Sequence, residues 1–158
     1  SFPTRRSSDL QGNVFYQFRG EVPFADDLGN IQMPAEAFTD DFTLIPNPDL
    51  VYFNVFARKS LNSTNDIFVI QFLEDDNGNG VYDENGDDLY EFVFRDLDTD
   101  WELISGRYSD FTLINDGGGG QRNPDRLLRM TILPIGLRAP FEGFLDFLNF
   151  TEVVPFEP

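Results

Sequence analysis

The residues of this chain best suited to chemistry lie in one acidic segment, Glu74–Asp88, with the sequence EDDNGNGVYDENGDD. Between Glu74 and Glu91 the chain has eight acidic side chains and no basic one. Carboxylates crowded in this way repel one another, and a bound cation removes that cost. Carboxylate and amide oxygens are the ligands that calcium and magnesium prefer, so the segment is a candidate metal site.

The spacing inside this segment matches the start of a calcium-binding loop. Asp75, Asn77 and Asn79 fall at loop positions 1, 3 and 5, and the glycine that follows falls at position 6, where the chain must turn sharply. Position 12 is Gly86 instead of the glutamate of an EF-hand, and strand-like sequences flank the segment. The alternative is a solvated hairpin, because Asn-Gly pairs also form good turns. We predict a short calcium turn with a structural calcium ion, whose ligands are Asp75, Asn77, Asn79, Val81, Asp83, Asp87 and Asp88.

The composition removes most other site chemistry. The 158 residues include no cysteine and no histidine, which excludes disulfides, thiolate nucleophiles, Ser-His-Asp hydrolysis and ordinary zinc sites. The net charge of −17 opposes binding to nucleic acids and anionic membranes, which are held mainly through cationic side chains. No apolar run approaches the roughly 20 residues that a transmembrane helix needs. We expect neither nucleic acid as a partner nor a transmembrane segment.

Short strand-like runs separated by turn residues must position these groups. The predicted strands are residues 14–18, 31–33, 50–58, 67–73, 89–95, 101–104, 111–114, 127–133 and 144–151. The run 67–73 is apolar on both faces, which predicts a central strand. The pattern predicts an all-β fold, a two-sheet antiparallel β-sandwich. The core of this sandwich is expected to contain Phe53, Val55, Val69, Phe72, Phe92, Phe94, Trp101, Ile132 and Phe147.

The first ten residues, SFPTRRSSDL, do not read like the rest of the chain. They resemble the translated read-through of a sequencing adapter, a scar found at the ends of environmental gene fragments. We therefore expect residues 1–10 to be a non-native or disordered tail that packs on nothing, and an export signal to be missing from the fragment. Residues 11–158 are expected to form one domain.

The second half of the chain resembles the galactose-binding-like jelly rolls that include carbohydrate-binding modules of exported bacterial proteins. The matching segments are Asp100–Ser105, Tyr108–Phe111, Asn123–Leu127 and Gly143–Thr151. The resemblance spans roughly residues 52–156 and implies the fold, but it carries no binding residue with it. From the residues themselves, Trp101 and Asp146 are the candidate ligand contacts. Trp101 is also a candidate core residue between the sheets, and Asp146 a candidate rim residue facing water.

These observations predict a non-catalytic binding or structural module of a secreted or cell-envelope protein, which binds a glycan and has a calcium-stabilised loop. The expected location is extracellular, periplasmic or at the cell surface. A first alternative is a glycoside hydrolase or lyase domain with a carboxylate pair such as Asp110 and Asp146. A second alternative is a purely structural domain that packs against a neighbouring domain, which an exposed aromatic face of Tyr90, Phe92 and Phe94 would favour.

Overall fold

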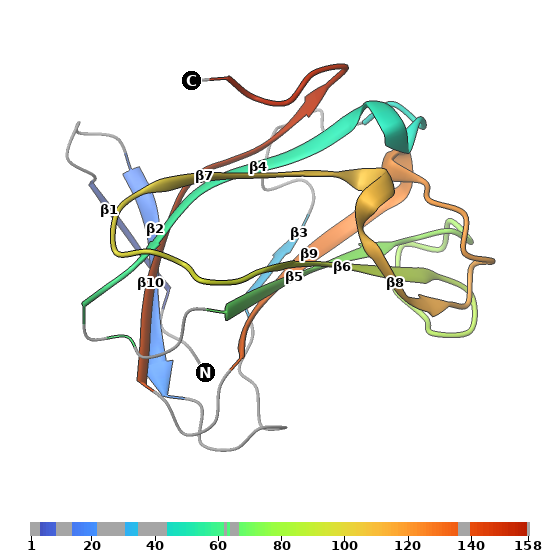
Figure 1. The fold of residues 1–158 in the computed structure, drawn as a ribbon. Helices are drawn as coiled ribbons and strands as arrows, with labels where there is room; N and C mark the ends of the chain where they lie inside the picture. Colours follow the sequence, from blue (N-terminus) through green and yellow to red (C-terminus); the bar gives the residue numbers. More distant parts are fainter. Residues whose placement is uncertain are drawn as a thin grey trace.

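Two antiparallel β-sheets packed face to face form the fold, as the computed structural model of the chain shows (Figure 1). The structure describes residues 4–8, 14–21, 31–34, 44–61, 63, 67–135 and 140–157. Sheet A has the strand order β1-β2-β10-β4-β7, and sheet B has the order β3-β9-β5-β6-β8. The strands are β1 Thr4–Ser8, β2 Val14–Glu21, β3 Ile31–Pro34, β4 Val51–Lys59, β5 Ile67–Glu74, β6 Asp88–Phe94, β7 Glu102–Arg107, β8 Thr112–Asp116, β9 Leu127–Ile135 and β10 Pro140–Glu152.

The predicted all-β sandwich is confirmed, and each of the nine predicted strands has a counterpart in the structure. The strand β5 lies between β9 and β6 in the middle of sheet B, as its two apolar faces predicted. The short turns η2 Pro48–Leu50, η3 Tyr108–Asp110 and η4 Pro124–Arg126 are the helical elements within the described ranges. Among these residues no helix is long and apolar enough to cross a membrane.

The strand β1 differs from the expectation for the first ten residues. Thr4–Ser8 pair with β2 along the edge of sheet A, with Thr4 opposite Phe18 and Ser8 opposite Val14. An edge strand needs only backbone hydrogen bonds, which any short segment without proline can supply. In the structure Thr4–Ser8 therefore pair with sheet A, and the non-native origin of residues 1–10 stays a prediction.

The core is aromatic and lies between the two sheets. Phe72 of β5 stacks on Phe111 with ring centroids 4.4 Å apart and meets Phe53 of β4 edge-on at 5.4 Å. Phe92 packs against this core, and a Cβ on Gly106 would come within 2.9 Å of its ring, so the glycine in β7 makes room for it. Rings in these arrangements add to the stability that their burial provides.

Most of the predicted core residues are buried. Exposed fractions of 6% or less are found for Phe53, Val55, Val69, Phe72 and Phe94. Phe92 is partly buried, and the side chains of Ile132 and Phe147 are outside what the structure describes. Tyr90, Phe92 and Phe94 face the core. They do not form the exposed aromatic face that would have favoured the alternative of a purely structural domain.

Candidate functional site

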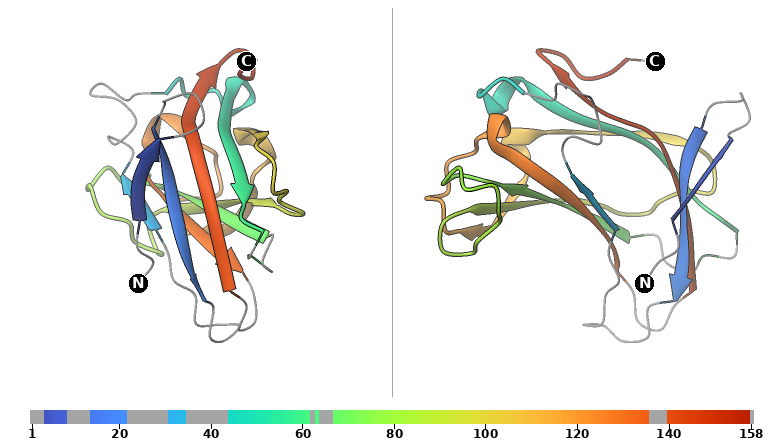
Figure 2. Two further views of the ribbon diagram at one scale, coloured as in Figure 1. Left: turned by 90° about the vertical axis from the view of Figure 1, so that its left-hand side faces the viewer. Right: turned by 180° about the vertical axis from the view of Figure 1, so that it is seen from behind.

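The sequence-predicted metal residues lie in the connection between β5 and β6, at one end of the sandwich (Figures 1 and 2). Their side-chain oxygens accept hydrogen bonds from backbone N–H groups of the loop itself. Asp75 accepts from Asn79 at 3.0 Å and from Gly80 at 2.8 Å. Asp87 is buried and accepts from Asn77 at 3.2 Å and from Asp83 at 2.7 Å. These bonds shape the loop, and calcium ligation by this set remains a prediction.

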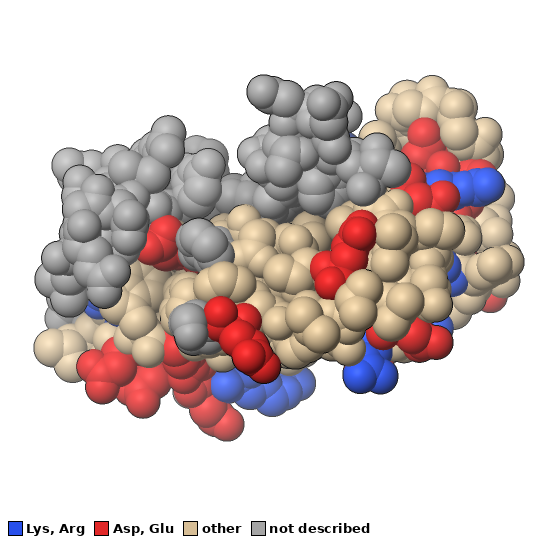
Figure 3. Space-filling view, turned by 90° about the horizontal axis from the view of Figure 1, so that it is seen from above, with Lys and Arg blue, Asp and Glu red and all other residues tan. Residues whose placement is uncertain are grey.

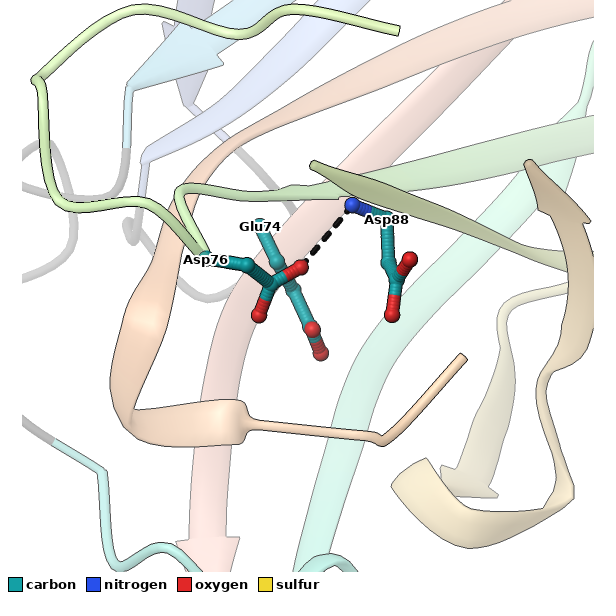
Figure 4. A group of neighbouring side chains, drawn as sticks. All are labelled: Glu74, Asp76 and Asp88. Carbon is teal, nitrogen blue, oxygen red and sulfur yellow. Dashed lines mark hydrogen bonds between the residues drawn. The ribbon is translucent and has the colours of Figure 1, made fainter. Parts of the chain in front are cut away.

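Three carboxylates converge at the ends of this loop, and one of them, Asp88, belongs to the predicted set. Glu74 ends β5, Asp76 follows it, and Asp88 begins β6. One oxygen of each lies within 4.8 Å of an oxygen of the other two, in an arrangement able to hold a metal ion (Figure 4). This group is named the acidic trio. Both Glu74 and Asp88 have no exposed surface, although carboxylates are seldom fully buried without a partner.

Each carboxylate of the acidic trio is held by hydrogen bonds. Glu74 Oε1 accepts from the Tyr108 hydroxyl at 2.7 Å and from the backbone N–H of Asn123 at 2.9 Å. Asp76 accepts from the backbone of Asp88 at 2.9 Å and from the Asn123 amide at 2.7 Å. The trio therefore joins the β5–β6 loop to the connection that leads into β9.

Asp88 ties the trio to a second loop. Its Oδ1 accepts from the backbone N–H of Gly118 at 2.8 Å, and its Oδ2 accepts from the Tyr90 hydroxyl at 3.2 Å. A Cβ on Gly118 would lie 2.3 Å from Asp76 Oδ2, so only glycine fits at this position without displacing that carboxylate. Packing against Asp76 therefore requires glycine at position 118.

Burial shifts the pKa values of two carboxyl groups of the acidic trio, Glu74 and Asp88. Burial raises the pKa of Glu74 to about 8, with repulsion from Asp76 and Asp88 in the same direction and the hydrogen bonds from Tyr108 and Asn123 opposing. Burial also raises the pKa of Asp88 above its ordinary value, while the Gly118 N–H lowers it. Desolvation disfavours the charged form of a carboxyl group, so Glu74 and Asp88 bind protons more readily than exposed carboxylates do.

The two predicted ligand contacts, Trp101 and Asp146, lie on the outer face of sheet A. The strands β10, β4 and β7 lie side by side in this sheet (Figure 2). Residues paired across the three strands form rows on its outer face. Asp146 and Leu103 pair with Phe56 across β4, and Phe144 pairs with Arg58. Trp101 precedes β7, with its ring 6.5 Å from that of Phe144. The structure thus brings Trp101 and Asp146 onto neighbouring rows of one face.

The position of Trp101 corrects one sequence-based expectation. Its ring is half-buried against Phe144 and under the guanidinium of Arg58, whose Cζ lies 5.1 Å from the Trp101 ring and 4.0 Å from the Phe144 ring. Glu102 pairs with Ala57, so residue 101 continues the row of Arg58 and faces away from the core. The expectation that Trp101 packs between the sheets is therefore wrong.

The middle of the same face is polar and covered. Asn54 has no exposed surface and donates to Asn149 at 3.0 Å and to Thr151 at 3.1 Å. It also accepts from the Ser105 hydroxyl at 2.8 Å and from the backbone N–H of Phe156 at 3.2 Å. The chain after β10 therefore turns back over the face, where the Phe156 ring contacts Phe56.

The two carboxylates of the hydrolase alternative, Asp110 and Asp146, come from different levels along β4. Asp110 is exposed in η3, which follows Arg107 and contacts η2. Arg107 pairs with Tyr52, whereas Asp146 pairs with Phe56, four residues further along β4. Four strand residues span about 13 Å, which is more than the separations of about 5 to 9.5 Å between the paired carboxylates of glycosidases.

No family model matches the sequence. No curated protein matches it either. Several solved structures have the same fold. A family 11 carbohydrate-binding module of Clostridium thermocellum, solved with a β-1,3-1,4-mixed-linked tetrasaccharide, is 12% identical with a TM-score of 0.69, over 99% of this chain and 85% of that one.

Two family 30 modules are similar as well. One is 14% identical with a TM-score of 0.68, over 100% of this chain and 77% of that one. The other, from a cellulosomal cellulase of Clostridium thermocellum, is 12% identical with a TM-score of 0.64, over 96% of this chain and 82% of that one. The chain therefore has the jelly-roll β-sandwich fold of carbohydrate-binding modules, as the resemblance of its second half predicted.

Proposed function

We propose that this protein is a non-catalytic carbohydrate-binding module of an exported protein and that it binds a glycan on the outer face of sheet A. The observation that carries the proposal is the half-buried Trp101 ring, which lies on the same face as Asp146. Sugar rings have apolar C–H faces surrounded by hydroxyl groups, so a flat aromatic surface beside charged hydrogen-bonding groups suits them. The similar module solved with a tetrasaccharide supports the same class of ligand.

Trp101 lies in the same row as Arg58, next to the rows of the face that the C-terminal tail contacts. The tail residue Phe156 contacts Phe56 and is bonded to Asn54, so it covers the middle rows. The guanidinium of Arg58 already lies against the Trp101 and Phe144 rings, which keeps both rings in place before a ligand arrives. Preorganised contacts of this kind lose less conformational entropy on binding. On the side seen in Figure 3, charged side chains form separate patches within a mostly uncharged surface.

A structural calcium ion and an exported location complete the proposal. The crowded carboxylates of the β5–β6 loop and the acidic trio support the presence of calcium. Calcium sites of extracellular modules commonly have dissociation constants of about 0.1 to 1 mM, near the levels of calcium found outside cells. In this proposal calcium stiffens one end of the sandwich, and the glycan binds on a separate face.

A glycan array, followed by calorimetry with mixed-linked β-glucan oligosaccharides, tests the glycan part. The variants Trp101→Ala and Asp146→Asn are expected to weaken binding at least about tenfold, or about 1.4 kcal/mol. Val93→Ala is the matched control, because Val93 is an exposed apolar residue on the strand β6 of the other sheet. Unchanged affinity in Trp101→Ala, or no binding to any glycan on the array, contradicts the proposal. Release of reducing sugar from the oligosaccharide contradicts its non-catalytic part.

A further inference from the structure

One oxygen of the acidic trio has no hydrogen-bond partner among the described residues. Glu74 has no exposed surface, and its Oε1 accepts two hydrogen bonds, but its Oε2 is buried and accepts none from the part of the chain that the structure describes. A buried carboxylate oxygen without a partner is costly, so native proteins rarely tolerate one. Figure 4 shows the Glu74 carboxylate beside those of Asp76 and Asp88. Glu74 is also one of the three carboxylates that each have an oxygen within 4.8 Å of the others.

The groups that bond to the trio are hydroxyl, amide and backbone N–H groups, and the two nearby arginines bond to backbone carbonyls instead. Among the described residues no lysine or arginine forms an ion pair with these three carboxylates. Arg126 donates to the backbone carbonyl of Asp76, and Arg122 lies over the Tyr90 ring. Ionised carboxylates that converge this closely in a buried site repel one another, and a bound cation offsets that repulsion.

We propose that a divalent cation, calcium by its ligand chemistry, binds between Glu74, Asp76 and Asp88 and clamps the β5–β6 loop to the Gly117–Asn123 connection. The assignment deepens the calcium part of the proposed function and is independent of glycan binding. The cation occupies a place different from that of the ligand set predicted from loop spacing. Only Asp88 is common to the two sets.

The geometry suits calcium. Oxygens on opposite sides of a calcium ion lie about 4.8 Å apart, because calcium–oxygen bonds are about 2.4 Å long. Each oxygen of Asp76 and Asp88 that already accepts one hydrogen bond keeps a second lone pair for the metal. A hollow of about 450 Å³ borders one member of the trio, Asp76, and is also lined by Asp75, Asn77, Asp125, Arg126 and Leu127.

The test is calorimetric titration of the chelator-treated full chain with calcium chloride. Glu74→Gln replaces a carboxylate of the trio, and Glu84→Gln makes the same change at an exposed loop residue that belongs to neither ligand set, so the two variants are a matched pair. We expect Glu74→Gln to weaken calcium binding at least tenfold and Glu84→Gln to change it less than about twofold, while Asp75→Asn tests the ligand set predicted from loop spacing. Thermal unfolding in chelator verifies that Glu74→Gln is folded.

Terbium luminescence excited through tyrosine locates the ion independently. The hydroxyls of Tyr108 and Tyr90 bond to two of the proposed ligands, so Tyr108→Phe should reduce the sensitised emission. Tyr52→Phe, on the outer face of sheet A, should leave it unchanged. The assignment is overturned if calcium produces no saturable heat, or if Asp75→Asn abolishes binding while Glu74→Gln retains it. Glycan affinity is measured separately on the same proteins, so loss of the cation site with intact glycan binding contradicts this assignment alone.

Discussion

The Tyr108 hydroxyl donates a hydrogen bond to Glu74 Oε1 at 2.7 Å, so the turn after β7 meets the last residue of β5 inside the sandwich. Neither side chain has exposed surface. Tyr108→Phe leaves that oxygen with only the Asn123 N–H, and we expect the free energy of unfolding to fall by about 1 to 3 kcal/mol. Urea denaturation measures this loss. Tyr52→Phe on the half-buried outer face should change stability by less than about 0.5 kcal/mol; an equal loss in both variants would contradict the prediction.

The stability of the metal-free protein should fall as the pH rises from about 4.5 to about 8. The pKa of Glu74 is about 8 in the folded chain and 4.5 without burial, so the folded state binds more protons in this interval. The contribution of protonated Glu74 is fully present below pH 4.5 and is lost as the pH approaches 8, at about 1.4 kcal/mol per pKa unit.

Calcium requires ionised carboxylates, so its stabilising effect should be larger at pH 8 than at pH 5. Melting temperatures at both pH values, with calcium and with chelator, measure this difference. Glu74→Gln should lose the part of the pH dependence that belongs to Glu74. If the variant and the parent protein keep the same pH profile in chelator, Glu74 does not titrate in this interval.

Gly118→Ala should damage the cation site more than Gly86→Ala does. In each case the added Cβ would meet a side-chain atom, Asp76 Oδ2 at 2.3 Å or Asn77 Nδ2 at 2.6 Å. Asp76 is held by two hydrogen bonds, whereas Asn77 is exposed and its amide can move away. We expect Gly118→Ala to lower the free energy of unfolding by about 2 kcal/mol and Gly86→Ala by less than about 0.5 kcal/mol. Chemical denaturation of both variants, together with calcium titration, provides the comparison.

Asn54→Ala should be the most destabilising polar substitution on the outer face of sheet A. It removes bonds to Asn149, Thr151 and Ser105 and releases the backbone N–H of Phe156. The expected loss is about 2 to 4 kcal/mol, against about 1 kcal/mol for Ser105→Ala, which removes one bond. Thermal unfolding distinguishes the two. Similar losses would mean that Asn54 is not the centre of this network.

The strands could be predicted from the sequence because their patterns are local. In the strand predicted over 50–58, Phe53 and Val55 were correctly expected in the core. The face on which Trp101 lies could not be found in this way, since it depends on the pairing of β7 with β4, with Glu102 opposite Ala57. Local patterns identify a strand, but the register with its neighbours decides which face its ends present.

The acidic trio was missed for a related reason. Counting calcium-loop positions from Asp75 selects alternate residues and so passes over Glu74 and Asp76. The structure gathers these two carboxylates with Asp88. A hairpin formed by the predicted strands 67–73 and 89–95 was the feature of the sequence that could have indicated the trio. Leu73 pairs with Leu89, so the next residue of β5, Glu74, comes opposite Asp88 at the mouth of the loop. The contacts with Tyr108, Gly118 and Asn123 come from distant segments, and a single sequence does not reveal them.

The placement of β9 and β10 within the sheets has a consequence for how the chain folds. Each of these late strands lies between two earlier ones, β9 between β3 and β5, and β10 between β2 and β4. Neither sheet can be completed during synthesis until residues 127–152 have left the ribosome. Chains dominated by such distant pairings fold slowly, in milliseconds to seconds, and expose unpaired strand edges in the meantime. Folding of this domain should therefore be a late, cooperative event that follows the synthesis of residues 127–152.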